Sequence, residues 1–318
     1  MPHQRHKLEF PPAPAVNKHA EETHCASLQW AREHDLISPD KIQQWDDARI
    51  GWIAARTNPH LPQEALRLVN DWYLWLFAVD DGYIDQPAQP LAPAQMVQLA
   101  SHLSCIVLDP DFPLTGAGRC ATGLRDVRRR IATVASPAQT ARWVEAVHGY
   151  LMAICWEVAN QATGTRPGRA EYTAMRRPAS AVWSAFYLMD ISAGYELQHS
   201  QLVDPRFREL ANVAVDLISW DNDYYSHFKE VQETGARHNI IRILAEEQDC
   251  DITEAMHRYV ELHDQHVDRF FDLEARLASR VTPEGSRFIE GIKHWIRASI
   301  DFQATSSRYM IRSTGDAV

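Results

Sequence analysis

Three oxygen-bearing side chains, Asn222, Ser226 and Glu230, recur at intervals of four residues. They follow an apolar run, 210–218, whose periodicity is helical. Positions four apart on an α-helix differ by about 40° of rotation, so an amide oxygen, a hydroxyl and a carboxylate share one face. This oxygen-only set suits Mg²⁺, which keeps its other coordination positions for water and phosphate oxygens. Lys229 lies beside Glu230, where its ammonium could contact an anion bound to that metal. Such triplets are also common on solvated helix faces. Other parts of the sequence are therefore needed to distinguish a metal site from a solvated face.

A second acidic cluster, Asp80, Asp81 and Asp85, ends a predicted helix over 62–81. Aspartate is a poor helix former, is costly to bury, and is electrostatically unfavourable at a helix C-terminus. A bound cation would therefore help to explain the cluster. The alternative is a solvated turn before the proline-rich loop at 87–93. We expect Asp80 to be a direct metal ligand and keep Asp81 and Asp85 as further metal-site candidates.

Composition excludes several classes of protein. The net charge of −10 argues against a nucleic-acid binder, and a phosphate-bearing substrate would then need local cations, which metal ions could supply. The five cysteines are scattered without a CxxC pair, so neither a disulfide framework nor a zinc site is indicated. The longest apolar stretch, 181–189, is too short to span a bilayer, and no apolar signal segment follows the first residues. We therefore expect a cytoplasmic protein.

The elements that must position these residues are helical. Apolar residues recur with helical period from His19 onward, and no run of alternating β-branched residues predicts a strand. Four pairs of an N-cap residue and a proline predict helix starts: Ser38-Pro39, Asn58-Pro59, Ser136-Pro137 and Thr282-Pro283. Besides 62–81, the predicted helices are 136–161, 168–199, 204–230, 236–248, 251–280 and 282–312. The fold class is all-α, with an extended arm over 1–17, one large helical domain over 18–312 and a flexible tail over 313–318.

Together the two acidic sites resemble those of the bacterial class I terpene synthases, and most of all the sesquiterpene cyclases. That family pairs an aspartate-rich motif with an N-D-x-x-S-x-x-x-E triad, as in D-D-G-Y-I-D over 80–85 and N-D-Y-Y-S-H-F-K-E over 222–230. The Arg-Tyr pair of the family matches Arg308-Tyr309, and its diphosphate-sensing arginine falls on Arg176. The resemblance spans 80–309. The third acid comes one position later than in the DDxxD form, which leaves the part played by Asp85 open.

The resemblance implies a helical bundle around a central cavity. Three Mg²⁺ ions would be held by Asp80 on one side and by the triad on the other, and would bind the diphosphate of a linear isoprenyl substrate. By the same resemblance, Arg176, Lys229, Arg308 and Tyr309 complete the diphosphate site. A helix break follows the sensor, with a carbonyl near Ser180 aimed into the cavity. Pro178 fits such a break because it removes a helical N–H, although an ordinary kinked helix would also fit.

The implied chemistry is ionisation of an allylic diphosphate, followed by cyclisation of the cation against apolar walls. Aromatic rings can stabilise cationic carbon. Candidates for that wall are Phe77, Trp183, Tyr187 and Phe302, each of which would also fit as ordinary core. Farnesyl diphosphate is the expected substrate, and geranyl and geranylgeranyl diphosphates stay open. Dimerisation is common in this fold family, but the chain gives no direct sign of a homodimer.

Four other functions are alternatives to this one. A chain-elongating isoprenyl diphosphate synthase also ionises an allylic diphosphate, but it carries two aspartate-rich motifs where this chain has one. A mono- or diterpene cyclase would share every motif named above. A metal-dependent phosphohydrolase usually brings paired histidines, which His238 and His263 do not provide. A non-catalytic binding protein gives no reason for Arg176 and Arg308-Tyr309 at these spacings.

Overall fold

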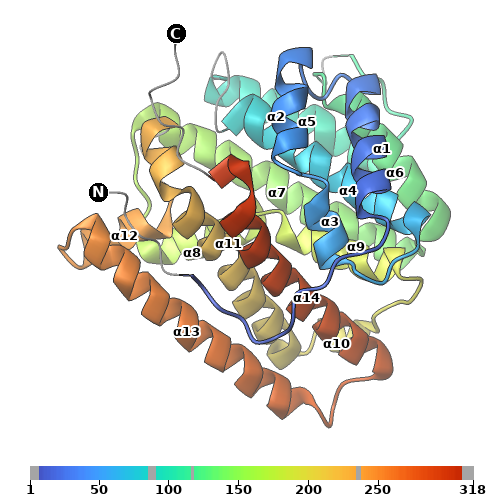
Figure 1. Cartoon of the computed structure of the whole chain (residues 1–318). Coiled ribbons are helices and arrows are strands. Elements are labelled where there is room, and N and C mark those ends of the chain that lie inside the picture. The colour runs from blue at the N-terminus through green and yellow to red at the C-terminus, as the bar shows by residue number, and fades with distance from the viewer. Residues whose placement is uncertain (1–6, 85–90, 116–117, 234–237, 310–318) are drawn as a thin grey trace.

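The computed structural model describes residues 7–84, 91–115, 118–233 and 238–309, and within these ranges it contains helices and no β-strand. Figure 1 shows them as one bundle. The α-helices are α1 (Ala20–Glu33), α2 (Ile42–Asp47), α3 (Trp52–Thr57), α4 (Gln63–Val79), α5 (Pro93–Leu108), α6 (Ala121–Val134), α7 (Pro137–Thr163), α8 (Arg169–Ala179), α9 (Val182–Ser192), α10 (His199–Leu202), α11 (Pro205–Glu233), α12 (Ile240–Glu247), α13 (Ile252–Leu277) and α14 (Pro283–Thr305). Three shorter elements complete the set: η1 (Pro39–Lys41), η2 (Asp80–Ile84) and η3 (Ser307–Tyr309).

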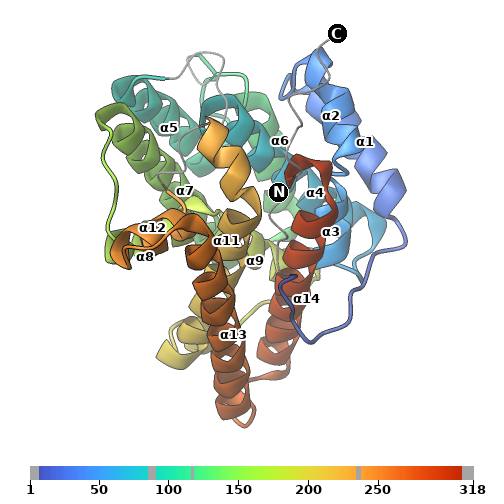
Figure 2. The same ribbon diagram turned by 60° about the vertical axis from the view of Figure 1, so that its left-hand side comes forward.

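Two helices carry the acidic motifs into the bundle from different sides. Helix α4 packs against α1, α6 and α9, and the aspartates follow its last turn. Helix α11 packs against α13, α14 and α8 and carries the triad (Figures 1 and 2). Helix α9 contacts both α4 and α11. The two motifs are therefore fixed relative to each other by shared packing rather than by sequence proximity.

The predicted helix starts hold at three of the four proline pairs. The Ser136 hydroxyl accepts a hydrogen bond from the backbone N–H of Gln139 at the start of α7, and Thr282 caps α14 in the same way. Ser38-Pro39 begins the short η1. The prediction at Asn58-Pro59 was wrong: Asn58 ends α3, and its side-chain amide donates to the carbonyl of Ala54. The next helix begins after Pro62.

The predicted helix over 168–199 is divided into α8, α9 and the start of α10. The break between α8 and α9 falls where the resemblance implied it. Pro178 lies in the last turn of α8, and its missing N–H leaves the carbonyl four residues earlier without its helical partner. Ala181 then adopts a left-handed conformation, with φ of 57°, which α-helices do not continue through.

The last predicted helix also ends earlier than expected. Helix α14 stops at Thr305, and Ser306 is extended, with ψ of 136°. The Ser306 hydroxyl donates to the carbonyl of Ala48 over 2.7 Å and accepts from the backbone N–H of Arg308. This turn redirects the chain, so that η3 brings Arg308 and Tyr309 back toward α11.

The N-terminal segment lies on the body of the protein. Residues 7–17 contain no helix, and Leu8 and Phe10 are both buried. The segment crosses α13 and α14 (Figure 1), where His263 donates to the carbonyl of Glu9 over 3.1 Å and Arg297 donates to the carbonyl of Phe10 over 3.1 Å. The predicted tail over 313–318 lies outside the described residues. Among the described helices, none combines the length and apolarity that crossing a bilayer requires.

Candidate active site

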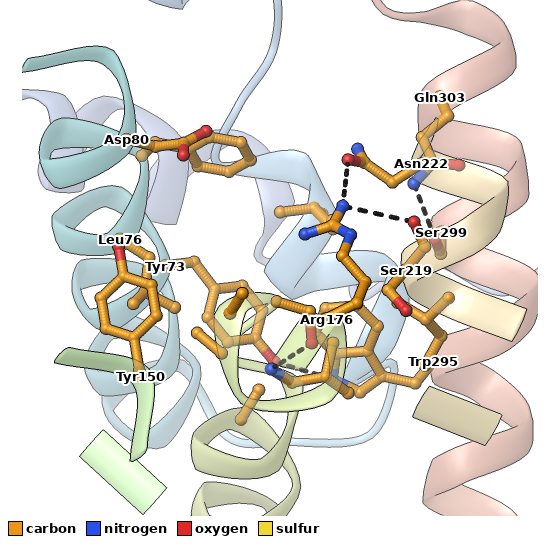
Figure 3. Close-up of a pocket in the computed structure, with 18 of the residues that line it drawn as sticks. Tyr73, Leu76, Asp80, Tyr150, Arg176, Ser219, Asn222, Trp295, Ser299 and Gln303 are labelled. Carbon is orange, nitrogen blue, oxygen red and sulfur yellow. Dashed lines mark hydrogen bonds between the residues drawn. The ribbon is translucent and has the colours of Figure 1, made fainter. Parts of the chain in front are cut away.

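A cleft with a polar end and an apolar end runs between α4 and α11. The apolar end is a cavity of about 160 Å³. It adjoins a polar hollow, and the two share Phe77, Asp80, Arg176, Asn222 and Tyr309 in their walls. Figure 3 shows Asp80 on one side of the cavity and Asn222 on the other, with Arg176 reaching between them. A single ligand can therefore contact both motifs and extend into the apolar end.

One face of α11 supplies the oxygen donors, as the spacing predicted. Asn222, Ser226 and Glu230 all line the polar hollow, and Lys229 lines it beside them. The Ser226 hydroxyl donates to a carboxylate oxygen of Glu230. The other oxygen of that carboxylate accepts from the side-chain amide of Asn239 over 2.9 Å. These bonds hold the Glu230 carboxylate toward the donor face.

Arg176 is fixed against α11 by a set of acceptors. Its guanidinium donates to Asp223 over 2.8 and 3.1 Å, and to the side-chain oxygen of Asn222 over 3.1 Å. It also donates to the backbone carbonyl of Ser219 over 3.3 Å. Burial alone would lower the pKa of Arg176, but the carboxylate of Asp223 raises it well above the usual value. A permanent positive charge therefore faces the cleft at its middle.

The C-terminal turn closes the polar end. The side-chain amide of Asn222 donates to the phenol oxygen of Tyr309 over 2.9 Å. Arg308 donates to both oxygens of Asp81, approaches Asp80 at 3.5 Å, and lies over the ring of Phe77 at 4.9 Å. Residues from η2, α4, α11 and η3 thus meet at one place.

The two adjacent aspartates occupy different environments. Asp80 lines the cleft, and its side chain is 42% exposed. Asp81 is engaged by Arg308 and by the indole N–H of Trp45, which donates to it over 3.1 Å. Burial would raise the pKa of Asp81, but Arg308 lowers it below the usual value. Asp80 is therefore the more accessible candidate ligand. Asp85 lies outside the described residues.

The apolar end is built mainly from α4, α9, α11 and α14. Its walls include Ile53, Tyr73, Leu76, Tyr150, Val182, Ala185, Ile218 and Trp295. Trp295 donates its indole N–H to the phenol oxygen of Tyr73 over 2.9 Å, so this pair forms one rigid aromatic corner (Figure 3). Of the predicted wall residues, Phe77 lines the cavity, as does Ser180 beside the helix break. The structure adds Tyr73, Tyr150 and Trp295, which the sequence did not single out.

Three predicted wall residues lie elsewhere. On α9, Val182 and Ala185 face the cavity, so Trp183 is turned about 100° away from Val182. The Trp183 ring lies under Arg208, and Tyr187 lies under Arg142. Phe302 is buried against Tyr309 and lines a separate hollow beside Ala48. The assignment of Trp183, Tyr187 and Phe302 to the wall was therefore wrong.

The donor chemistry of the polar hollow fits a magnesium site. Its candidate ligands are the carboxylates of Asp80 and Glu230, the Asn222 amide oxygen and the Ser226 hydroxyl, all hard oxygen donors. Within the described residues, no three His, Cys, Asp or Glu side chains converge as a metal group, so this candidate set depends on the Asn222 amide and the Ser226 hydroxyl beside the two carboxylates. The hydrogen bond from Asn239 to Glu230 is the kind of outer contact that orients a metal-binding carboxylate.

Comparison with known sequences agrees with this geometry. The profile of terpene synthase family 2, C-terminal metal binding, matches residues 71–269. The chain is 29% identical to 4-epi-cubebol synthase of Streptosporangium roseum, over 95% of this chain and 92% of the relative. It is 30% identical to (+)-T-muurolol synthase of Roseiflexus castenholzii, over 96% and 94%. It is also 31% identical to bonnadiene synthase of Allokutzneria albata, over 81% and 74%.

Solved structures show the same fold. The SVS_A2 protein from ancestral sequence reconstruction superposes with a TM-score of 0.88 at 25% identity, covering 95% of this chain and 90% of that one. The crystal structure of α-eudesmol synthase gives a TM-score of 0.85 at 23% identity, with 95% and 99% covered. The all-α fold is thus shared along nearly the whole chain.

Proposed function

Since the chain belongs to the terpene synthase family, as a class I enzyme and a lyase that uses a divalent metal, we propose that it ionises farnesyl diphosphate and cyclises the cation to a sesquiterpene. The observation that carries this proposal is the cleft itself. Oxygen donors and cations from five elements (η2, α7, α8, α11 and η3) line one end, and a mainly apolar cavity continues from it. A diphosphate with a long hydrocarbon chain likewise has one charged end and one apolar end.

The polar end would bind the diphosphate. Three Mg²⁺ ions, held by Asp80 on one side and by Asn222, Ser226 and Glu230 on the other, would neutralise the leaving diphosphate as its bond to carbon breaks. Asp81 and Asp85 remain candidates for supporting this site. Asp81 would do so through Arg308, which it already binds.

The cationic side chains would hold the diphosphate in place. Arg176 lies between the two ends of the cleft, so its guanidinium is placed to contact the oxygen nearest the hydrocarbon chain. Lys229, Arg308 and the Tyr309 hydroxyl line the polar hollow around it. The hollow also holds the carboxylates of Asp80, Glu157, Asp223 and Glu230, so the metal ions would supply the further positive charge that a bound diphosphate needs.

The apolar end would fold the hydrocarbon chain and exclude water. Phe77 lies at the junction of the two ends, where the allylic cation would form, and its ring face can stabilise positive charge. Tyr73 and Trp295 close the far corner. Ser180, at the break after α8, lines the same cavity, and we propose that its backbone carbonyl faces the reacting carbons.

Relatives support farnesyl diphosphate as the substrate. The enzymes of Streptosporangium roseum and Roseiflexus castenholzii are both described as cyclising (2E,6E)-farnesyl diphosphate, and each aligns with at least 95% of this chain. A chain-elongating synthase would need a second aspartate-rich motif where this chain has Asn222, Ser226 and Glu230.

The test is incubation of purified protein with geranyl, farnesyl and geranylgeranyl diphosphates separately, each with Mg²⁺ and with EDTA. Products are analysed by gas chromatography–mass spectrometry. We expect a metal-dependent cyclic product from farnesyl diphosphate. A cyclic product only from another chain length would correct the substrate, and condensation with added isopentenyl diphosphate would replace the cyclase by an elongase.

A further inference from the structure

One wall of the apolar cavity carries a polar pair. Gln303 and Ser299 lie one turn apart on α14, and both line the cavity. They are 5% and 1% exposed. Figure 3 shows them on the same wall as Trp295, on the side of the cavity where Asn222 lies. A buried amide and a buried hydroxyl are costly beside a hydrocarbon chain unless their hydrogen bonds are satisfied.

The pair is satisfied only in part. The side-chain N–H of Gln303 donates to the Ser299 hydroxyl oxygen over 3.0 Å. The Gln303 side-chain oxygen is buried and has no hydrogen-bond partner among the described residues. The other polar groups of this region are bonded: the Ser219 hydroxyl donates to the carbonyl of Val215, and the Tyr73 phenol accepts from Trp295. Gln303 is thus the cavity-lining residue with an unmet buried acceptor.

We propose that Gln303 and Ser299 bind one water molecule at the cavity wall, and that this water captures the final carbocation, so that the product is a cyclic terpene alcohol. Buried water commonly satisfies such orphaned groups. A hydroxyl oxygen has two acceptor sites, so Ser299 can accept from water as well as from Gln303. A water that donated one hydrogen to each residue would keep its own lone pairs free for a carbocation.

The reaction balances with water as the second substrate. The carbon–oxygen bond to diphosphate breaks and leaves a carbocation. An oxygen lone pair of the water then forms a new carbon–oxygen bond, and one proton of that water passes to the released diphosphate. The sum is prenyl diphosphate plus water giving terpene alcohol plus diphosphate. Neither redox change nor a further reactant is needed. This inference rests on the proposed function, because it assigns the step that ends the same reaction.

The test combines isotope labelling with three variants. Wild-type protein is incubated with farnesyl diphosphate and Mg²⁺ in H₂¹⁸O, and products are separated by gas chromatography–mass spectrometry. We expect an alcohol that carries ¹⁸O. In Gln303→Met, which keeps the side-chain volume but removes the acceptor, and in Ser299→Ala, the alcohol share of all products is expected to fall and the hydrocarbon share to rise.

The matched control is Gln201→Met. Gln201 is also a buried glutamine that is bonded to a hydroxyl, accepting from Thr282, but it lies outside the cavity. Its variant should leave the alcohol share unchanged. Because the readout is a share, a slower enzyme cannot imitate the effect. If thermal melting shows that Gln303→Met is not folded, the alcohol share of Ser299→Ala tests the inference alone.

Three outcomes would overturn the inference while leaving the cyclase intact: only hydrocarbons from the wild type, an alcohol without ¹⁸O, or an unchanged alcohol share in the folded variants. The absence of cyclic products from all three prenyl diphosphates would instead overturn the proposed function, and this inference with it.

Discussion

Arg308 binds Asp81 through two hydrogen bonds, of 2.7 and 3.0 Å, across 227 positions of the sequence. The pair joins the aspartate-rich element η2 to the C-terminal turn η3. The same guanidinium lies 4.9 Å from the ring of Phe77 and lines the hollow proposed for the diphosphate. Asp81 thus holds the Arg308 guanidinium at the edge of the site. A bound diphosphate would compete with Asp81 for this cation.

The first prediction concerns that guanidinium. Arg308→Lys keeps the charge but cannot form a two-pronged contact with a carboxylate or a phosphate. We expect kcat/KM for farnesyl diphosphate to fall at least about tenfold, which corresponds to roughly 1.4 kcal/mol of lost stabilisation. Arg269→Lys is the control, because Arg269 pairs with Glu209 at an exposed position. Equal kinetics in the two variants would remove Arg308 from the site.

The second prediction concerns the donor face of α11. Glu230→Ala and Asn222→Ala should each abolish turnover, because each removes a proposed metal ligand, while the fold is kept. Binding is measured by thermal melting with Mg²⁺ and inorganic diphosphate together. The wild type should melt at a higher temperature with this mixture, and both variants should lose that shift. Glu254→Gln, at an exposed position on α13, should keep it. Full activity in either ligand variant would contradict the metal assignment.

The third prediction tests which aromatic residues line the apolar end of the cleft. Phe77→Leu should change the ratio of cyclic products, because Phe77 lines both ends of the cleft. Trp183→Leu should leave the ratio unchanged, because its ring lies under Arg208 and not in the cavity. Both product profiles are read by gas chromatography–mass spectrometry. A changed profile in Trp183→Leu would restore that residue to the wall.

The fourth prediction is a pH dependence of stability at His263. Its ring nitrogens lie 2.8 Å from Asp221 and 3.1 Å from the Glu9 carbonyl, so both face acceptors and both must carry protons. Burial alone would lower the pKa of His263, but Asp221 raises it to about 9. The charged groups around the ring are Asp221, which also accepts from Tyr259, and Asp264.

The sign follows from the raised pKa. The stabilisation from charged His263 is fully present below about pH 6.5 and is lost as the pH rises through about 9. It amounts to at most about 3 kcal/mol in the free energy of unfolding. Denaturant unfolding of the wild type and of His263→Gln, compared at several pH values from 6 to 10, measures the difference. That difference should shrink as pH rises; a constant difference would show that His263 does not titrate there.

Local patterns predicted much of the fold and the polar end of the site. A spacing of four residues fixes Asn222, Ser226 and Glu230 on one face whatever surrounds the helix. Capping by Ser136 and Thr282 depends only on neighbouring residues, and the structure confirms it. Asn58-Pro59 has the same local signal, but buried contacts of Asn58 with the end of α3 override it.

The apolar wall could not be predicted in the same way. Which side of α9 faces the cavity depends on how α9 packs against α4 and α11, and aromatic residue type says nothing about that packing. The sequence does not distinguish Trp183 from Trp295. Of the two, only Trp295 lines the cavity, where its indole donates a hydrogen bond to the Tyr73 phenol. The unmet oxygen of Gln303 is likewise visible only once α14 is placed.

The N-terminal segment, residues 7–17, constrains the order in which the protein folds because it packs on α13 and α14. Its two anchoring bonds join residues separated by 254 and 287 positions. Helices α13 and α14, which receive Glu9 and Phe10, are made long after them during synthesis, so this segment can dock only once those helices exist. Until then the ring of Phe10 lacks its partners Phe270 and Phe271. The beginning of the chain would thus settle at the end of folding, and a shortened N-terminus would leave an apolar strip uncovered on the finished enzyme.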